Sequence, residues 1–199
     1  MDSDPESVIG RRGSYAKGVA RRKEILDRAI EVFAERGADG TSLRRIAEAI
    51  GVSHATLLHY FDSREQLLVA VYDHAEQLRS VTDDPGASAV EVMVDAATRN
   101  VGVPGMVQLY STLVATAIEE PAGEAKDFFT RRFDVVRAES ARRLREEQAA
   151  GRVRDDIDAD TLAAMLVAVS DGLQTQWLLD PAIDLRETLS LFSALLAPR

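Results

Sequence analysis

The chain contains no cysteine, which excludes disulfide bonds and cysteine-ligated metal sites. No apolar run approaches the roughly 18 consecutive residues that a membrane-spanning helix requires. The first ten residues, MDSDPESVIG, are acidic and polar, whereas a secretory signal combines basic residues with an apolar run. These absences favour a cytoplasmic protein without a membrane partner.

Motifs of the common catalytic classes are missing as well. The sequence has no G-x-x-x-x-G-K-[ST] phosphate loop, no G-x-G-x-x-G after a strand and no G-x-S-x-G nucleophile motif. Acidic pairs such as Glu119 with Glu120 fall at predicted helix ends or in loops, where solvated charge is the ordinary explanation. We therefore expect no enzymatic activity and no cofactor.

The three histidines do not predict a metal site. His54 and His59 lie five positions apart, about 140° around a helix, so they cannot face one ion. His74 falls on another predicted helix, and no cysteine is available as a ligand. We expect no metal.

The composition is that of a globular protein: 46% of the 199 residues are hydrophobic and 29% are charged. Apolar residues recur at helical spacing, and no segment alternates with a period of two over the length of a strand. The sequence therefore predicts an all-α fold, with a three-helix N-terminal head and a larger C-terminal helical body, about nine helices in all.

Charge is distributed unevenly along the chain, whose formal net charge is -9. Residues 11–64 carry eleven Lys or Arg and seven Asp or Glu, whereas residues 65–199 carry thirteen basic and twenty-three acidic side chains. Because local charge governs contacts with phosphates, the acidic total does not exclude a nucleic-acid partner for the basic segment.

Helix boundaries follow from capping and breaking residues. The first helix is predicted from about Gly18 to Arg36, and Ser53 is predicted to cap the third. A capping box of Ser63 with Gln66 opens a fourth helix over about 63–80. The break DDPGAS at 83–88 precedes four to five longer segments, of which the last two have Asp160 and Asp184 as candidate N-caps. These segments are 88–101, 105–119, 124–150, 159–180 and 184–197.

The stretch GTSLRRIAEAIGVSHATLLHYFDSREQLL, residues 40–68, has the pattern of a helix-turn-helix. Gly51 permits a tight turn, and apolar residues such as Ile46 and Leu57 hold the two helices together. No acidic residue occurs between Glu48 and Asp62, so the outer face of the third helix presents no carboxylate to a phosphate backbone. Its small and hydrogen-bonding side chains suit the DNA major groove, which is about 12 Å wide.

This stretch resembles the N-terminal domain of TetR-type, tetracycline-repressor-like, regulators. The shared pattern is roughly T-[TS]-hydrophobic-x-x-I-A-x-x-hydrophobic-G-V-S-x-x-[TS]-L-Y-x-H-F-x-S-K-E-x-L, and it is specific over about residues 20–70. The segment DGLQTQWLLDP at 171–181 resembles one class of C-terminal domain in the family. The resemblance implies a flexible arm over 1–17, a DNA-binding domain over 18–64 and a ligand-binding and dimerisation domain over 65–199.

The resemblance also implies roles for individual residues. His54, Ala55 and His59 would face bases in the major groove, and Thr56 and Tyr60 would bind phosphates. Leu58 departs from the family, which usually has Tyr there, and could contact a thymine methyl instead. The full set of implied DNA-binding residues is Ser42, Arg44, Ser53, His54, Ala55, Thr56, Leu58, His59, Tyr60 and Arg64.

The segment RRGSYAKGVARRKE before the head has two interpretations. As a disordered basic arm it could reach along the DNA backbone or into the minor groove. As a solvated basic tail it would have no partner. Its basic residues are Arg11, Arg12, Lys17, Arg21, Arg22 and Lys23.

In the body the resemblance implies a cavity for a small-molecule effector. Large or adaptable side chains with a few polar groups suit such a cavity, although they more often form plain core. Asp171 in the cavity would favour a cationic ligand; the alternative is an Asp171 paired with an N–H or Arg at an interface. The candidate lining residues are Met93, Met106, Tyr110, Phe129, Phe133, Met165, Gln174 and Trp177.

The last two predicted helices suit a four-helix bundle between two copies of the chain, which is how the family dimerises. A dimer would set two recognition helices one DNA turn apart, about 34–36 Å, and would require a palindromic operator. The predicted interface residues are Ala164, Ala168, Leu189, Phe192 and Leu196.

The sequence thus favours a homodimeric, sequence-specific DNA-binding transcriptional regulator, in the first instance a repressor released from double-stranded DNA by a small molecule. A helical small-molecule-binding or protein-interaction module without specific DNA binding is the alternative. The operator sequence, the effector, the regulated genes, and whether the ligand releases or recruits DNA stay open at this stage, as does activation in place of repression.

Overall fold

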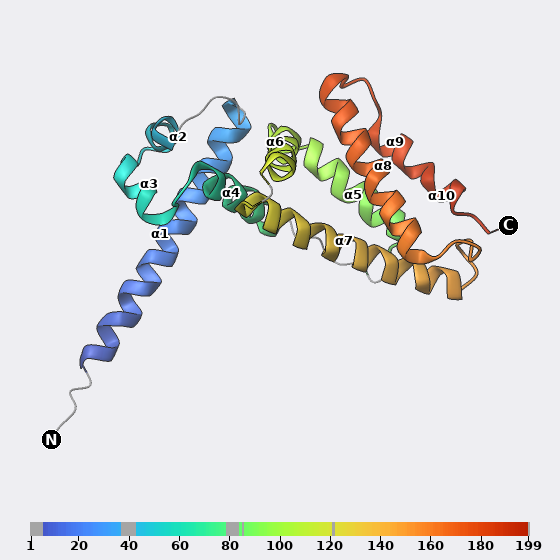
Figure 1. Ribbon diagram of the computed structural model, residues 1–199, viewed down its shortest axis with the longest axis horizontal. Helices are drawn as coiled ribbons and strands as arrows, with labels where there is room; N and C mark the ends of the chain where they lie inside the picture. The colour runs from blue at the N-terminus through green and yellow to red at the C-terminus, as the bar shows by residue number, and fades with distance from the viewer. Residues whose placement is uncertain (1–5, 37–42, 79–83, 85, 121, 199) are drawn as a thin grey trace.

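A computed structural model describes residues 6–36, 43–78, 84, 86–120 and 122–198, and every regular element in these ranges is a helix (Figure 1). This confirms the all-α prediction. The helices are α1 (Glu6–Arg36), α2 (Leu43–Ala49), α3 (His54–Tyr60), α4 (Arg64–Leu78), α5 (Ala89–Val101), α6 (Met106–Glu119), α7 (Glu124–Ala149), α8 (Ala159–Leu179), α9 (Leu185–Ser190) and α10 (Phe192–Leu195).

Helix α1 begins at Glu6 and not near Gly18. The prediction of a flexible arm over 1–17 is therefore wrong for residues 6–17, which are helical, while residues 1–5 lie outside the described ranges. No proline interrupts the sequence between 6 and 36, and glycines in a helix cost only about 1 kcal/mol each. The first half of α1 projects away from the rest of the molecule (Figure 1).

The head consists of α1, α2 and α3 around the predicted apolar faces. Ile25, Ala29 and Phe33 of α1 are buried against Ile46 of α2 and Leu57 of α3. The same core continues through α4 into α6 and the start of α7. Helix α4 therefore shares a core with both parts of the molecule, and the division of the chain at residues 64 and 65 stays a prediction.

A second core joins α5, the later part of α7, α8, α9 and α10. Helix α7 runs along the body from the head to its far end, so it contributes to both cores (Figure 1). No described helix is by itself long and apolar enough to cross a membrane; α5 and α6 pass that test only as a pair, and they are bent by 103° at the break between them.

The caps match the sequence predictions in part. Asp184 caps α9 by accepting the backbone N–H three residues on, at 2.8 Å. Ser63 likewise accepts the Gln66 N–H at 2.9 Å, but the Gln66 side chain accepts the N–H of the residue before Ser63, so the predicted capping box is incomplete. Helix α8 is capped by Asp158 and not by Asp160, which lies in its first turn.

Candidate nucleic-acid interface and ligand cavity

The turn between α2 and α3 depends on a glycine. Gly51 has a φ of 72°, which side chains with a Cβ rarely adopt. The Val52 N–H donates to the Ala47 carbonyl at 2.9 Å and closes the end of α2. Arg28 of α1 donates to the Ile50 carbonyl at 3.2 Å, so a side chain of the first helix closes the same end. The direction of α3 is thereby fixed relative to both other head helices.

Helix α3 has one buried and one exposed side. Leu57 and Phe61, which follows the helix directly, are fully buried and attach it to the head core. His54, Ala55 and His59 are exposed. The three side chains implied to face bases are therefore free of the core and accessible to a groove.

Ser53 and Thr56 are joined at the start of α3. Ser53 Oγ accepts the Thr56 N–H at 2.9 Å, and the two hydroxyl oxygens lie 2.7 Å apart. Ser53 is thus the predicted N-cap, and a phosphate bound by the Thr56 hydroxyl would replace its bond to Ser53. Leu58 is 44% exposed, and the Tyr60 ring meets His59 edge-on with centroids 5.0 Å apart.

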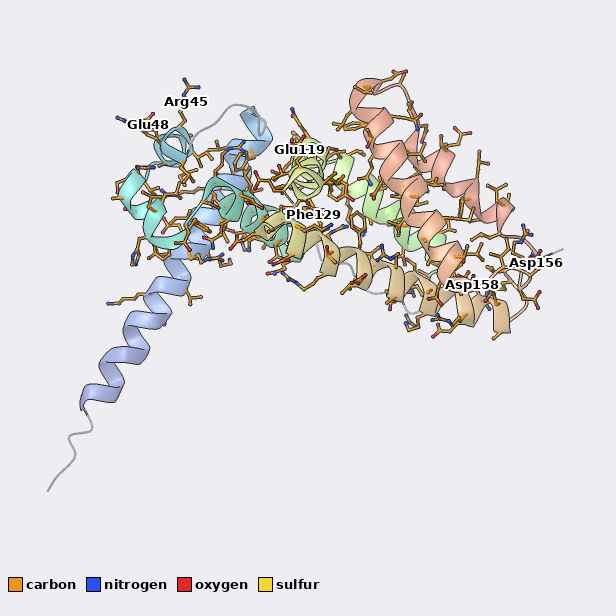
Figure 2. The ribbon with its side chains drawn as sticks, viewed as in Figure 1. Arg45, Glu48, Glu119, Phe129, Asp156 and Asp158 are labelled. Carbon is orange, nitrogen blue, oxygen red and sulfur yellow. The ribbon has the colours of Figure 1, made fainter. Side chains whose placement is uncertain are left out.

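Basic side chains flank α3. Arg44 and Arg45 are exposed on α2, and Arg64 is half-buried at the start of α4. Arg44 pairs with Glu48 at 3.4 Å, and because both are exposed this pair contributes little stability and is easily exchanged for a phosphate. Figure 2 shows Arg45 and Glu48 projecting from α2. Ser42 lies outside the described residues.

A cavity of about 230 Å³ lies in the body, with walls from α5, α7 and α8 and with Tyr110 of α6 at one side. Of the eight predicted lining residues, Met93, Tyr110 and Gln174 line it. The other five do not line it. Met106, Phe129 and Phe133 pack in the core shared with the head, and Met165 and Trp177 lie elsewhere on α8. These five were predicted wrongly because helical periodicity identifies an apolar face but not the neighbour that the face meets.

Arg132 of α7 is a cavity residue that the sequence analysis missed. Its Nη2 donates to Glu76 Oε1 of α4 at 2.6 Å, and its Nε donates to Oε2 at 3.0 Å. The guanidinium lies over the rings of Tyr72 and Tyr110, 5.6 and 5.4 Å from their centroids. Burial lowers the pKa of Arg132, but the hydrogen bonds and charge of Glu76 outweigh burial and leave it raised. Its sequence neighbourhood has the pattern of a charged outer face, so no local signal marks it as buried.

Two further polar groups stand at the cavity wall. Tyr110 is 7% exposed, and its hydroxyl has no hydrogen-bond partner among the described residues. The Asp171 carboxylate is near enough for each group to affect the other's pKa, but their geometry is not that of a hydrogen bond. Burial raises the pKa of Asp171, and Tyr110 and Arg132 offset this only in part. Asn100 donates to Gln174 at 3.0 Å.

A larger, more polar hollow of about 440 Å³ lies at the other end of the body. Its charged groups have structural roles: Arg143 donates to the carbonyls of Asp84 and Ala87, and Glu147 accepts the Ala89 N–H at 3.1 Å. These bonds hold the segment before α5 against α7. The cavity at Tyr110 is the better ligand candidate, because the Tyr110 hydroxyl on its wall has no hydrogen-bond partner among the described residues.

Three of the predicted dimer residues have another role. Leu189, Phe192 and Leu196 are buried in the core of a single chain, so the prediction that they meet a second copy is wrong. The segment is apolar on two faces, and periodicity alone does not show which face turns inward. Its outer face carries Leu191 and Leu195, which are 62% and 66% exposed.

Helix α8 also has exposed apolar side chains. Ala164 and Ala168, both predicted interface residues, are exposed, and so are Met165 and Leu179 on the same helix. Small and large apolar side chains on one helix allow close packing against a second helix.

Comparisons with known proteins also indicate a DNA-binding regulator. The family model for "Bacterial regulatory proteins, tetR family" matches residues 25–71. A Mycobacterium tuberculosis protein named as an HTH-type transcriptional repressor is 31% identical over 157 residues, which are 77% of this chain and 80% of that protein.

Two solved structures have the same overall fold. One, from Rhodococcus sp. and assigned to the TetR family, superposes with a TM-score of 0.74 at 25% identity and covers 89% of this chain and 98% of that one. The other, assigned as a transcriptional regulator from Saccharomonospora viridis and solved in complex with choline, has a TM-score of 0.73 at 25% identity and covers 91% and 100%.

Proposed function

Since the chain belongs to the TetR family of bacterial regulatory proteins, we propose that it is a homodimeric repressor that binds a palindromic operator through α3. The observation that carries the proposal is the exposed, carboxylate-free face of α3, which Gly51 and the Ser53 cap hold in a fixed direction. Because an operator is part of the bacterial DNA, we place the protein in the cytoplasm. Binding to an operator involves no catalysis, so we propose no enzymatic activity.

The residues of the head divide between base and phosphate contacts. We assign His54, Ala55 and His59 to base edges and Leu58 to a thymine methyl, because these side chains are exposed on one helix. Phosphate contacts fall to side chains around that face, which are Arg44, Ser53, Thr56, Tyr60 and Arg64. The resemblance adds Ser42, which lies outside the described residues.

Dimerisation uses the exposed faces of α8 and of the segment containing α9 and α10. The observation in favour is that both elements carry exposed apolar side chains, among them Ala164, Ala168, Leu191 and Leu195. Two copies joined there would present two α3 helices to successive major grooves, about 34–36 Å apart. A dimer also doubles the phosphate contacts that one weakly basic head can make.

Release by a small molecule uses the cavity and α4. Arg132 connects the cavity wall to Glu76 of α4, and Glu65 of α4 accepts the Ala125 N–H at the start of α7 at 2.7 Å. A Cβ at Gly123 would lie 2.8 Å from the Glu65 carboxylate, so glycine allows this close approach. A ligand that favours a different position of α4 would change the separation of the two heads.

The test is a titration of the purified protein against labelled duplex from upstream of its own gene, at two salt concentrations and with unrelated competitor DNA. We expect saturable binding that survives competitor and weakens with salt, because neutralised phosphates release counterions. A double variant, Thr56→Ala with His59→Ala, should lose specific binding and still form a folded dimer. Thr130→Ala, an exposed threonine on α7, is the matched control and should bind normally. Unchanged affinity in the double variant would refute the assignment.

A further inference from the structure

We propose that the cavity between α5, α7 and α8 takes a small organic cation, a protonated amine on a compact apolar body, with Asp171 as its counter-charge. The proposal rests on the function proposed above, in which this cavity is the effector site. It goes beyond that function because it identifies the chemistry of the ligand.

The charges on the cavity wall leave one carboxylate without an ion-pair partner. Arg132 is occupied by Glu76, whose carboxylate it binds through both Nε and Nη2. Glu139 is bound by Arg142 at 2.6 Å and by Arg143 at 2.9 Å. Asp171 is the lining carboxylate for which no salt bridge forms within the described part of the chain.

The surroundings of Asp171 disfavour the charged form of its side chain. Burial raises the pKa of Asp171, which means that its charged form loses solvation that its neighbours do not fully replace. A cation in the cavity would supply the missing interaction. An anion would meet Asp171 directly, and the guanidinium of Arg132 is already bonded to Glu76.

The burial of Tyr110 is a second observation at the same place. This side chain is buried, lines the cavity, and has a hydroxyl without a hydrogen-bond partner in the described residues. An unpaired buried hydroxyl is destabilising, and a group bound in the cavity would supply its partner. An ammonium N–H beside Asp171 can donate to the Tyr110 oxygen as well, in a charge-assisted hydrogen bond that the neutral O–H of an alcohol does not provide.

The remaining walls define the body of the ligand. They come from α5, α7 and α8 and are mostly apolar, with polar side chains at Asn100, Ser140, Ser170 and Gln174, so the part of the ligand away from the charge must be largely apolar. The volume of about 230 Å³ equals that of roughly eight liquid waters, well below the size of a typical drug site. The apolar lining residues are Val92, Met93, Ala96, Ala97, Val135, Val136 and Val167.

The experiment is isothermal titration of the full-length protein with three probes of nearly equal shape: benzylamine, benzyl alcohol and benzoate. Butylamine and hexylamine are added so that one poorly fitting body does not decide the result. The variant is Asp171→Asn, and the matched control is Asp134→Asn, which removes the same charge from an exposed position on α7. Tyr110→Phe serves as a second variant that keeps the ring.

We expect the amines to bind more tightly than the alcohol and benzoate. Asp171→Asn should weaken amine binding about tenfold or more and leave the alcohol unchanged, because only the charge interaction is lost. Asp134→Asn should change neither affinity, and Tyr110→Phe should weaken the amines more than the alcohol. The proposal is overturned if no amine binds, if the alcohol or benzoate binds as tightly, or if Asp171→Asn has no effect.

Operator titration of the same samples separates this proposal from the function on which it rests. Loss of operator affinity on adding amine supports both. Amine binding that depends on Asp171 but leaves operator affinity unchanged supports the ligand class and overturns the effector role. Specific operator binding with no amine binding overturns the ligand class and leaves the repressor function standing.

Discussion

Replacing Glu76 by Gln is expected to destabilise the fold by about 2 kcal/mol, which is large for a single change outside the apolar core. The substitution keeps the shape of the side chain and removes its charge. It acts on the contact between α4 and α7, where Glu76 receives three hydrogen bonds from Arg132 at 2.6 to 3.2 Å and a fourth from the Tyr72 hydroxyl at 2.9 Å.

The magnitude follows from burial. The side chains of Arg132 and Glu76 are only 20% and 31% exposed. In Glu76→Gln, water therefore cannot fully solvate the Arg132 guanidinium, which is left without its counter-charge. Removing one partner of a fully buried pair costs about 3–5 kcal/mol, and the partial exposure here reduces that figure. The Gln oxygen can still accept the Tyr72 hydroxyl, so no further loss is added for that bond.

The assay is urea unfolding at one fixed protein concentration, because dimer stability depends on concentration. Asp134→Asn is the control: its pair with Arg137 is exposed, and it should cost less than about 0.5 kcal/mol. In a double-mutant cycle with Arg132→Met, the two losses should overlap by about 1–2 kcal/mol. If Glu76→Gln cost no more than Asp134→Asn, the reasoning from burial would be refuted.

Three further changes test other parts of the structure by the same assay. Tyr110→Phe should change the unfolding free energy by less than about 0.5 kcal/mol, since the hydroxyl has no partner; a loss above about 1 kcal/mol would indicate a hydrogen bond. Gly51→Ala should cost about 1–2 kcal/mol because φ is 72°, and an unchanged melting temperature would contradict this. The hydrogen bond from His74 lowers the pKa of Asp27, so the Asp27 carboxylate stabilises the fold above about pH 5, by less than about 1 kcal/mol relative to Asp27→Asn. This difference in unfolding free energy should shrink as the pH falls below about 4 and the carboxylate is protonated. A difference that stays constant with pH would exclude the linkage.

The head could be predicted from sequence because its determinants are local. Gly51 and Ser53 fix the ends of α2 and α3 within a few residues, and both act in the structure as predicted. The exposure of His54 and His59 follows once Leu57 is assigned to the core, since helical periodicity then leaves them outside.

The body was harder to predict because its determinants are long-range. Leu189 and Leu191 are similar in type and two positions apart, yet one is buried and the other 62% exposed. Only the position of α5 and α8 around that segment decides between them. Arg132 is a similar case: its burial depends on Glu76, which is 56 residues away in the chain, and no local pattern records that pairing.

The contacts of α4 give a physical route from the cavity to the head. Helix α4 packs on α1 as well as on α6 and α7. Towards the head, His74 bonds Asp27 of α1 at 2.7 Å, and towards the body Glu76 holds Arg132 at the cavity wall. A charge bound at Asp171 changes the electrostatic environment of Arg132, and through Glu76 it acts on α4. Because linkage is reciprocal, a ligand that lowers operator affinity through this helix must itself bind more weakly, by the same factor, when the operator is bound.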